Sequence, residues 1–140
     1  MTRPSAKLRR MVARRAKGRC EYCRASEAQT GQECVVDHVI PTSQGGTNEL
    51  DNLCLSCGWC NSFKQAQTNG WDEVLRRRVR LLHPRRDRWT KHFRWNRDHT
   101  RIIPITSIGR VTESVLRLNR PKLVQARALW NAELKRRRGG

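Results

Sequence analysis

Two side chains suited to acid–base and metal chemistry stand next to each other in the first third of the chain. Asp37 and His38 are adjacent within the apolar stretch VVDHVI, residues 35–40. Apolar strands do not usually carry a carboxylate beside a titratable imidazole. A carboxylate oxygen suits a hard cation such as Mg²⁺, and a neutral imidazole can accept a proton from water. The pair is therefore a candidate for hydrolysis, and the alternative is a polar pair with a structural role.

Six cysteines surround this pair in the sequence. Paired C-x-x-C units are typical of a tetrahedral thiolate zinc site, whereas a disulfide framework suits secreted chains, and no secretory signal is visible. The first unit lies in CEYC, and the second is open because CLSCGWC contains two overlapping C-x-x-C units. The 33 residues between Cys23 and Cys57 exceed the common zinc-ribbon gap, so we expect an inserted segment there. The six are Cys20, Cys23, Cys34, Cys54, Cys57 and Cys60.

The charge of the chain is high and unevenly distributed. The 140 residues carry a formal net charge of +18. Residues 1–24 hold nine basic residues and one acid, net +8, and residues 71–140 hold twenty basic residues and six acids, net +14. Residues 25–70 hold one basic residue and five acids, net −4. Such a balance favours a polyanion partner, most simply nucleic acid, around a centre whose carboxylates suit a cation; the alternative is a basic protein with a merely solvated surface.

Short elements are expected to position the candidate pair. Ser5 is a suitable N-cap for a helix over about 6–17, and the strand at 35–40 must stop at Pro41. SQGGTN predicts a turn, and CGWCNSFK predicts a short helix. In a regular strand adjacent side chains point to opposite faces, so we expect the strand to end, twist or bulge near the pair.

The remaining half of the chain predicts three further elements. Leu75, Val79 and Leu82 have helical spacing, and Pro84 would end that helix. Residues 89–105 predict a hairpin, and Pro121 suits the first turn of a last helix. We therefore divide the chain into a basic N-terminal helix, a core with the zinc site, and a basic extension of helix, hairpin and helix packed on or beside the core, over residues 1–18, 19–70 and 71–140.

The order of these motifs resembles a known family. CEYC, DHVIP, GG and DNLCLSCGWCNSFK follow one another as in the HNH endonucleases of the McrA-like, zinc-stapled type, over about residues 18–65. The resemblance implies an α+β fold: a ββα-metal (HNH) core stapled by a zinc site of four cysteines, here with helical and hairpin flanking segments. It also implies that the zinc ligands are Cys20, Cys23, Cys57 and Cys60, since the family has a ligand directly before Asn61.

The same resemblance implies roles for individual residues. His38 matches the general base, and Asp37 matches a ligand of the catalytic cation. Asn52 matches the middle Asn, which braces the hairpin and helps to hold the base. Asn61 falls where many members have His, so the chain is a DH–N–N variant in which Asn supplies a neutral oxygen ligand.

These observations predict a metal-dependent DNA endonuclease that nicks one strand per active site. The expected cofactors are a catalytic Mg²⁺ or Mn²⁺ and a structural Zn²⁺. The alternatives are a zinc-stapled DNA-binding module without cleavage activity and a protein that binds or cleaves RNA. We expect a cytoplasmic protein without a membrane span that acts alone, as a homodimer or within a larger nuclease complex. Candidate phosphate contacts are Lys64, Arg76, Arg77 and Arg78, the alternative being a solvated basic face.

Overall fold

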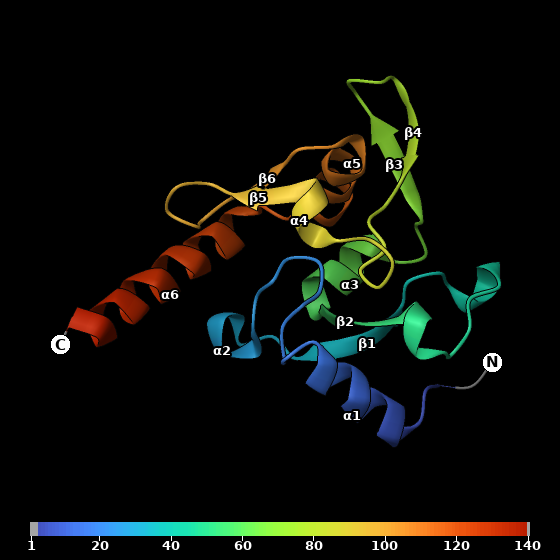
Figure 1. Cartoon of the computed structure of the whole chain (residues 1–140), viewed down its shortest axis with the longest axis horizontal. Helices are drawn as coiled ribbons and strands as arrows, with labels where there is room; N and C mark the ends of the chain where they lie inside the picture. The colour runs from blue at the N-terminus through green and yellow to red at the C-terminus, as the bar shows by residue number, and fades with distance from the viewer. Residues whose placement is uncertain (1–2, 140) are drawn as a thin grey trace.

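The computed structural model describes residues 3–139 and has an α+β architecture, as predicted. Within these residues, short helices alternate with three two-stranded antiparallel sheets (Figure 1). The helices are α1 (Ala6–Arg15), α2 (Glu27–Thr30), α3 (Gly58–Lys64), α4 (Trp89–His92), α5 (Ser107–Leu116) and α6 (Pro121–Gly139). The strands are β1 (Cys34–His38), β2 (Leu53–Cys57), β3 (Asn69–Asp72), β4 (Arg77–Arg80), β5 (Phe93–Trp95) and β6 (Ile102–Pro104).

The strands β1 and β2 and the helix α3 form a ββα unit. In the antiparallel pair, His38 lies opposite Leu53. β1 ends at His38, before the stop predicted at Pro41, which agrees with the end, twist or bulge expected near the pair. The chain passes from β2 into α3 without a loop, because Cys57 caps the helix: its Sγ accepts the N–H of Cys60 at 3.4 Å. The unit therefore brings the end of β1 next to a helix that begins inside a C-x-x-C motif.

The helix α1 covers the β1–β2 hairpin from its outer side. Ser5 caps it by accepting the N–H of Leu8 at 3.2 Å, which confirms the predicted start. Val12 is fully buried and forms an apolar cluster with Leu53 and Leu55 of β2. Burial of such side chains stabilises a contact by about 1.5–3 kcal/mol each, so α1 is held mainly by this cluster.

The prediction of a helix around Leu75–Leu82 is wrong, because most of this segment belongs to the hairpin β3–β4. In the turn, Asp72 accepts the N–H of Leu75 at 2.9 Å, and Arg76 takes a left-handed conformation with φ of 54°. Gly70 packs so closely on α5 that an added Cβ would lie 2.9 Å from Val115. The helical spacing of the apolar residues therefore did not mark a buried helix face.

The rest of the extension contains the predicted hairpin and last helix, together with two helices that the sequence did not predict, α4 and α5. β5 and β6 pair within residues 89–105, and α6 begins at Pro121. The additional helix α5 is capped by Thr106, which accepts the N–H of Gly109 at 3.0 Å. One apolar cluster runs from Tyr22 in the cysteine-rich segment to Leu116 of α5, while α6 and the β3–β4 hairpin extend outward (Figure 1).

Candidate metal centre and active site

Four sulfur atoms gather where the first C-x-x-C unit meets the start of α3. Their Sγ atoms all lie within 4.8 Å of one another, and all four residues are buried. Tetrahedral bonds of about 2.3 Å to zinc would separate the sulfurs by about 3.8 Å, and the Sγ atoms of Cys23 and Cys57 are 3.9 Å apart. Within residues 3–139 this is the one group of three or more His, Cys, Asp or Glu residues positioned to bind a metal; it comprises Cys20, Cys23, Cys57 and Cys60.

The pKa values of Cys20 and Cys57 are lowered in this cluster, whereas contacts with the neighbouring cysteines raise those of Cys23 and Cys60, so the surroundings favour a thiolate at the first two. Hydrogen bonds from the thiols of Cys20, and then of its other neighbours, lower the pKa of Cys57 far below its ordinary value. The Arg120 guanidinium donates to the Sγ of Cys57 at 3.7 Å and to that of Cys60 at 3.8 Å. Burial acts to lower the pKa of Arg120, but the cysteines outweigh it and raise the pKa, so the cation persists beside the sulfurs.

The two other cysteines lie outside the cluster. The Sγ of Cys54 is buried 3.7 Å from the Tyr22 hydroxyl, and burial raises the pKa of this thiol well above its ordinary value. Cys34 is half-buried, and burial raises its pKa to about 12. The overlap of C-x-x-C units in CLSCGWC is thus resolved in favour of Cys57 with Cys60.

Asp37 is directed toward the helix α3 and lies largely inside the protein. Its Oδ2 is 3.4 Å from the Nζ of Lys64 and accepts no hydrogen bond from the residues that the structure describes. Burial raises the pKa of Asp37, and the Lys64 ammonium partly offsets this effect. Lys64, predicted as a phosphate contact, is only 1% exposed and also points at the carbonyl of His38, 3.4 Å away. The lysine is therefore part of the site itself.

His38 has a partner that the sequence did not indicate. Its Nε2 lies 2.6 Å from the Oδ1 of Asn48, in the loop between β1 and β2. A carbonyl oxygen can only accept, so this contact makes Nε2 the protonated nitrogen and leaves the lone pair on Nδ1. Asn48 lies in SQGGTN, a stretch that predicts a turn, and asparagine is common in turns. Its position two residues after the second glycine is the one feature of the sequence that could have marked it as a partner of His38.

Asn52 holds the loop and does not touch the imidazole. Its Oδ1 accepts the N–H of Ile40 at 2.9 Å, and its Nδ2 donates to the carbonyls of Ile40 at 3.1 Å and Thr47 at 2.9 Å. A Cβ at Gly46 would lie 1.7 Å from the Ile40 carbonyl, so this close approach requires glycine. The expected bracing of the hairpin thus reaches His38 only through the loop that carries Asn48.

Asn61 lies on α3 one helical turn before Lys64. The helix packs against β1, and the Asn61 side chain is partly exposed. Within residues 3–139 this side chain forms no hydrogen bond, which leaves its amide oxygen available. The three predicted positions Asp37, His38 and Asn61 therefore belong to the end of one strand and the helix that packs on it.

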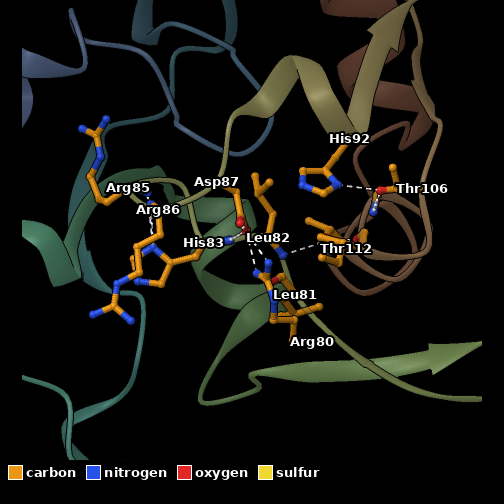
Figure 2. A network of polar contacts seen from close by, with 12 residues as sticks. Arg80, Leu81, Leu82, His83, Arg85, Arg86, Asp87, His92, Thr106 and Thr112 are labelled. Atoms are coloured by element: carbon orange, nitrogen blue, oxygen red, sulfur yellow. Dashed lines mark hydrogen bonds and ion pairs between the residues drawn. The ribbon is translucent and has the colours of Figure 1, made fainter.

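A basic segment from the end of β4 to α4 lies near the buried lysine of the site. The Asp87 carboxylate lies at its centre and accepts two hydrogen bonds from the Arg80 guanidinium, at 2.6 and 2.9 Å, and one from the His83 N–H at 2.7 Å (Figure 2). The segment borders a cavity of about 280 Å³ that Lys64 also lines, with Arg80 and Arg86 on its rim. Sequence reasoning missed these two arginines, because charge alone did not separate them from others.

The predicted contacts Arg76, Arg77 and Arg78 lie on the β3–β4 hairpin. All three are exposed, and the hairpin extends away from the ββα unit (Figure 1). Arg78 donates to the Asn69 side chain on the paired strand at 3.2 Å. The arginines therefore form a basic arm at a distance from the cysteine cluster.

Comparison with known proteins gives one match. The family model for the HNH endonuclease matches residues 20–67, the segment from the first cysteine through α3. No curated protein and no solved structure matches the chain. Among the residues described by the structure, none of the helices is long and apolar enough to cross a membrane.

Proposed function

Residues 20–67 are an HNH endonuclease domain, and from this premise we propose that the protein is a metal-dependent endonuclease that hydrolyses phosphodiester bonds in DNA. The observation that carries the proposal is the pairing of a buried carboxylate, Asp37, with an imidazole that Asn48 holds in one tautomer. HNH nucleases act on DNA and use divalent metals, and the net charge of +18 suits such a polyanion.

His38 is the proposed general base. With the proton of Nε2 directed to Asn48, Nδ1 accepts the proton of the water that attacks the phosphorus. Asn48 then steadies the imidazolium by accepting its Nε2–H. A positioned base of this kind contributes about 10²–10⁴-fold to the rate.

Asp37 and Asn61 are the proposed ligands of the catalytic cation. Both supply oxygen atoms, and the Oδ2 of Asp37, which accepts no hydrogen bond within the described residues, fits a hard cation such as Mg²⁺ or Mn²⁺. A bound divalent cation would neutralise charge on the phosphate and on the leaving oxygen. Asn52 holds the loop, and the four clustered cysteines would hold a structural Zn²⁺ at the start of α3.

DNA is proposed to contact the basic surfaces on either side of this site. Lys64 lies beside Asp37 and adds positive charge where a phosphate would bind. Arg76, Arg77 and Arg78 on the projecting hairpin would contact the backbone, which fixes position without reading sequence. The core at 19–70 would thus cut, while the basic helix at 1–18 and the extension at 71–140 would bind.

We propose that each active site nicks one strand. The predicted set of one base and one cation occurs once in the chain, and the site holds a single carboxylate, too few for a two-cation mechanism. A break in both strands would then require a homodimer, a second encounter or a partner nuclease.

The second candidate is a DNA-binding module that does not cut. The observation that favours it is the Lys64 ammonium, which already neutralises the carboxylate proposed to hold the cation. In a module of this kind, the lysine would replace the cation permanently. In an enzyme, the cation would bind Asp37 in competition with the lysine.

Plasmid relaxation distinguishes the two candidates. We expect supercoiled DNA to become open circular with Mg²⁺, to remain intact with EDTA, and to be cut again when Mg²⁺ is restored. His38→Ala should abolish cutting and leave zinc content and DNA affinity unchanged. Leu129→Ala, a change of an exposed side chain on α6 that lines neither site, is the control and should cut normally. Intact plasmid with the wild-type protein, or robust cutting by His38→Ala, would reject the enzyme as proposed.

A further inference from the structure

An open groove of about 790 Å³ lies on another part of the surface, and none of the residues given roles above lines it except Cys23. Its walls come from the cysteine-rich segment, the β5–β6 hairpin and α6. Tryptophan and arginine side chains dominate the lining: Trp89, Trp95, Trp130, Arg24, Arg94 and Arg127. Within the described residues, neither Asp nor Glu lines the groove, so it combines aromatic surface with uncompensated positive charge.

The aromatic rings of the groove are arranged in a series. Trp89 is 7% exposed and donates its Nε1–H to the Tyr22 carbonyl at 3.0 Å, so it forms the floor. The ring of Trp95 lies 5.8 Å from that of Trp89, and His99 stacks on Trp95 at 6.0 Å with an interplanar angle of 22°. Trp95 and Trp130 are partly exposed, which leaves ring surface for a ligand.

Arginines surround these rings at two depths. Arg127 is buried, with its guanidinium carbon 5.2 Å from the centre of the Trp95 ring. Burial lowers the pKa of Arg127 to about 10, so it is still a cation at neutral pH. Arg24 lies 4.9 Å over the Trp89 ring, and Arg94 is exposed on β5. The groove therefore offers charge to an anion both at its floor and at its edge.

Hydrogen bonds between the walls give the groove a fixed shape. The Asn131 side chain on α6 donates to the carbonyls of Asp98 at 3.0 Å and His99 at 3.3 Å, in the β5–β6 turn. Arg127 donates to the Thr100 carbonyl at 3.0 Å and to that of Leu118 at 2.8 Å. A groove that is formed before the ligand arrives costs little reorganisation on binding.

We propose that this groove binds single-stranded nucleic acid. Unpaired bases would stack on Trp95 and Trp130, and the phosphates between them would meet Arg24 and Arg94. Bases within a duplex hide their faces in the stack, whereas unpaired bases expose them to aromatic side chains. The inference goes beyond cleavage and does not depend on it: the groove would hold an unpaired strand next to the DNA that the Asp37–His38 site contacts.

Binding measurements on full-length protein test the proposal. His38→Ala serves as the parent, so that cleavage does not interfere. The probes are a fluorescein-labelled oligothymidylate of about 12 nucleotides, an oligouridylate of the same length and a blunt duplex of the same charge. We expect tighter binding of a single strand than of the duplex, and the tighter of the two single strands identifies DNA or RNA as the ligand.

Two variants and two matched controls locate the site. Trp130→Ala and Arg94→Ala should each raise the Kd for the single strand about tenfold and leave the Kd for the duplex nearly unchanged. Trp59→Ala on α3 removes a half-exposed tryptophan elsewhere and should change neither Kd. Arg14→Ala removes an exposed arginine from the basic helix α1 and should weaken binding of the single strand and of the duplex equally.

Arg94 is exposed, so its variant remains informative even if Trp130→Ala does not fold. Equal affinity for single strand and duplex, or equal losses in the variants and controls, would overturn the proposal. Nicking of a plasmid is measured separately, so either of these results would not bear on the proposed nuclease activity. Conversely, a protein that does not nick but still prefers single strands would support the groove assignment and not the nuclease.

Discussion

Two proposed cation sites at the ββα unit differ in how complete they are. The cysteine cluster has four buried sulfur atoms within 4.8 Å of one another, contributed by two C-x-x-C units. The proposed catalytic site has one carboxylate, Asp37, and a lysine ammonium 3.4 Å from it. The fold brings all four sulfur ligands of the first site together. In the second site the Lys64 ammonium already lies beside Asp37, so a metal ion would have to compete with it for the carboxylate.

The difference teaches what each cation is for. A site closed by four protein ligands has no position for a substrate, which is typical of structural zinc. A site with few protein ligands leaves positions for water and phosphate, which is typical of Mg²⁺ in phosphoryl chemistry. On this proposal, the same scaffold would use a closed thiolate site for stability and an open oxygen site for the reaction.

The largest expected effect comes from opening the closed site. Cys60→Ser should lose zinc and cooperative unfolding, because structural zinc in small domains contributes about 10–16 kcal/mol, comparable to the whole stability of a domain. Cys54→Ser, a change at a buried cysteine outside the cluster, should keep one zinc per chain. Elemental analysis and thermal unfolding measure both. Zinc lost from Cys54→Ser and kept in Cys60→Ser would reverse the ligand assignment.

Next in size is the removal of the carboxylate from the open site. Asp37→Asn should reduce nicking about 10³-fold, because charge stabilisation by a catalytic cation supplies several kcal/mol. It should also lower the free energy of unfolding by about 2–4 kcal/mol, because Lys64 is left buried without a counter-charge.

The double variant Asp37→Asn with Lys64→Met separates the two effects. Stability in urea should return toward the wild-type value, while nicking stays low. If Asp37→Asn alone has the same urea midpoint as the wild type, then burial of Lys64 does not depend on its ion pair with Asp37, which would contradict this description.

A smaller effect is expected when His38 is kept but loses the hydrogen bond that orients its imidazole. Asn48→Ala should lower the nicking rate about tenfold, a part of the contribution of a positioned base. Asn48→Asp should retain the acceptor and favour the imidazolium, so the acid limb of the pH–rate profile should move to higher pH. A purely structural role for Asn48 would change the rate without shifting this limb, and that outcome would contradict the assignment.

The smallest effect concerns the attachment of the β3–β4 arm, which carries Arg76 to Arg78. Arg110 on α5 holds the pKa of Asp72 to about 2 through hydrogen bonds of 2.8 and 3.0 Å. A carboxyl with a lowered pKa stabilises the fold above its unfolded value, near 4, and this contribution is lost as the pH falls toward 2.

Thermal unfolding across this range measures the contribution of Asp72. Asp72→Asn should unfold at a slightly lower temperature than the wild type at pH 6, and the gap should close in acid. A gap that does not depend on pH would show that the Arg110 contact does not carry the effect.

Sequence spacing identified much of the site because chemistry constrains it tightly. The C-x-x-C units and the adjacent Asp37 and His38 followed from residue types and from the resemblance to HNH endonucleases. An irregularity of the strand near this pair followed from the opposite directions of adjacent side chains, but its exact end did not. Lys64 was read as a surface residue, because a lysine is rarely buried unless it is paired, and its partner is 27 positions away in the chain. Asn48 was hidden in a turn sequence whose composition suits many roles.

The flanking elements were harder to predict, because their spacing is ambiguous. Leu75, Val79 and Leu82 fit a helix by period, yet the side chain of Asp72 and the close packing of Gly70 on α5 fix a hairpin. The packing of Gly70 on Val111 and Val115 joins segments about 40 residues apart in the chain, and local patterns do not contain such a contact. Tertiary contacts therefore overrode local propensity in the extension, whereas the elements of the core agree with those that its motifs predicted.

The measurement that tests this two-site account most directly is a metal count on one preparation under two conditions. After passage over a chelating resin, the protein should hold one zinc per chain. Titration with Mn²⁺, followed by electron paramagnetic resonance, should then show one further ion bound in the wild type and none in Asp37→Asn, with zinc unchanged in both. Mn²⁺ bound equally by Asp37→Asn, or no Mn²⁺ bound by the wild type even with DNA present, would contradict it.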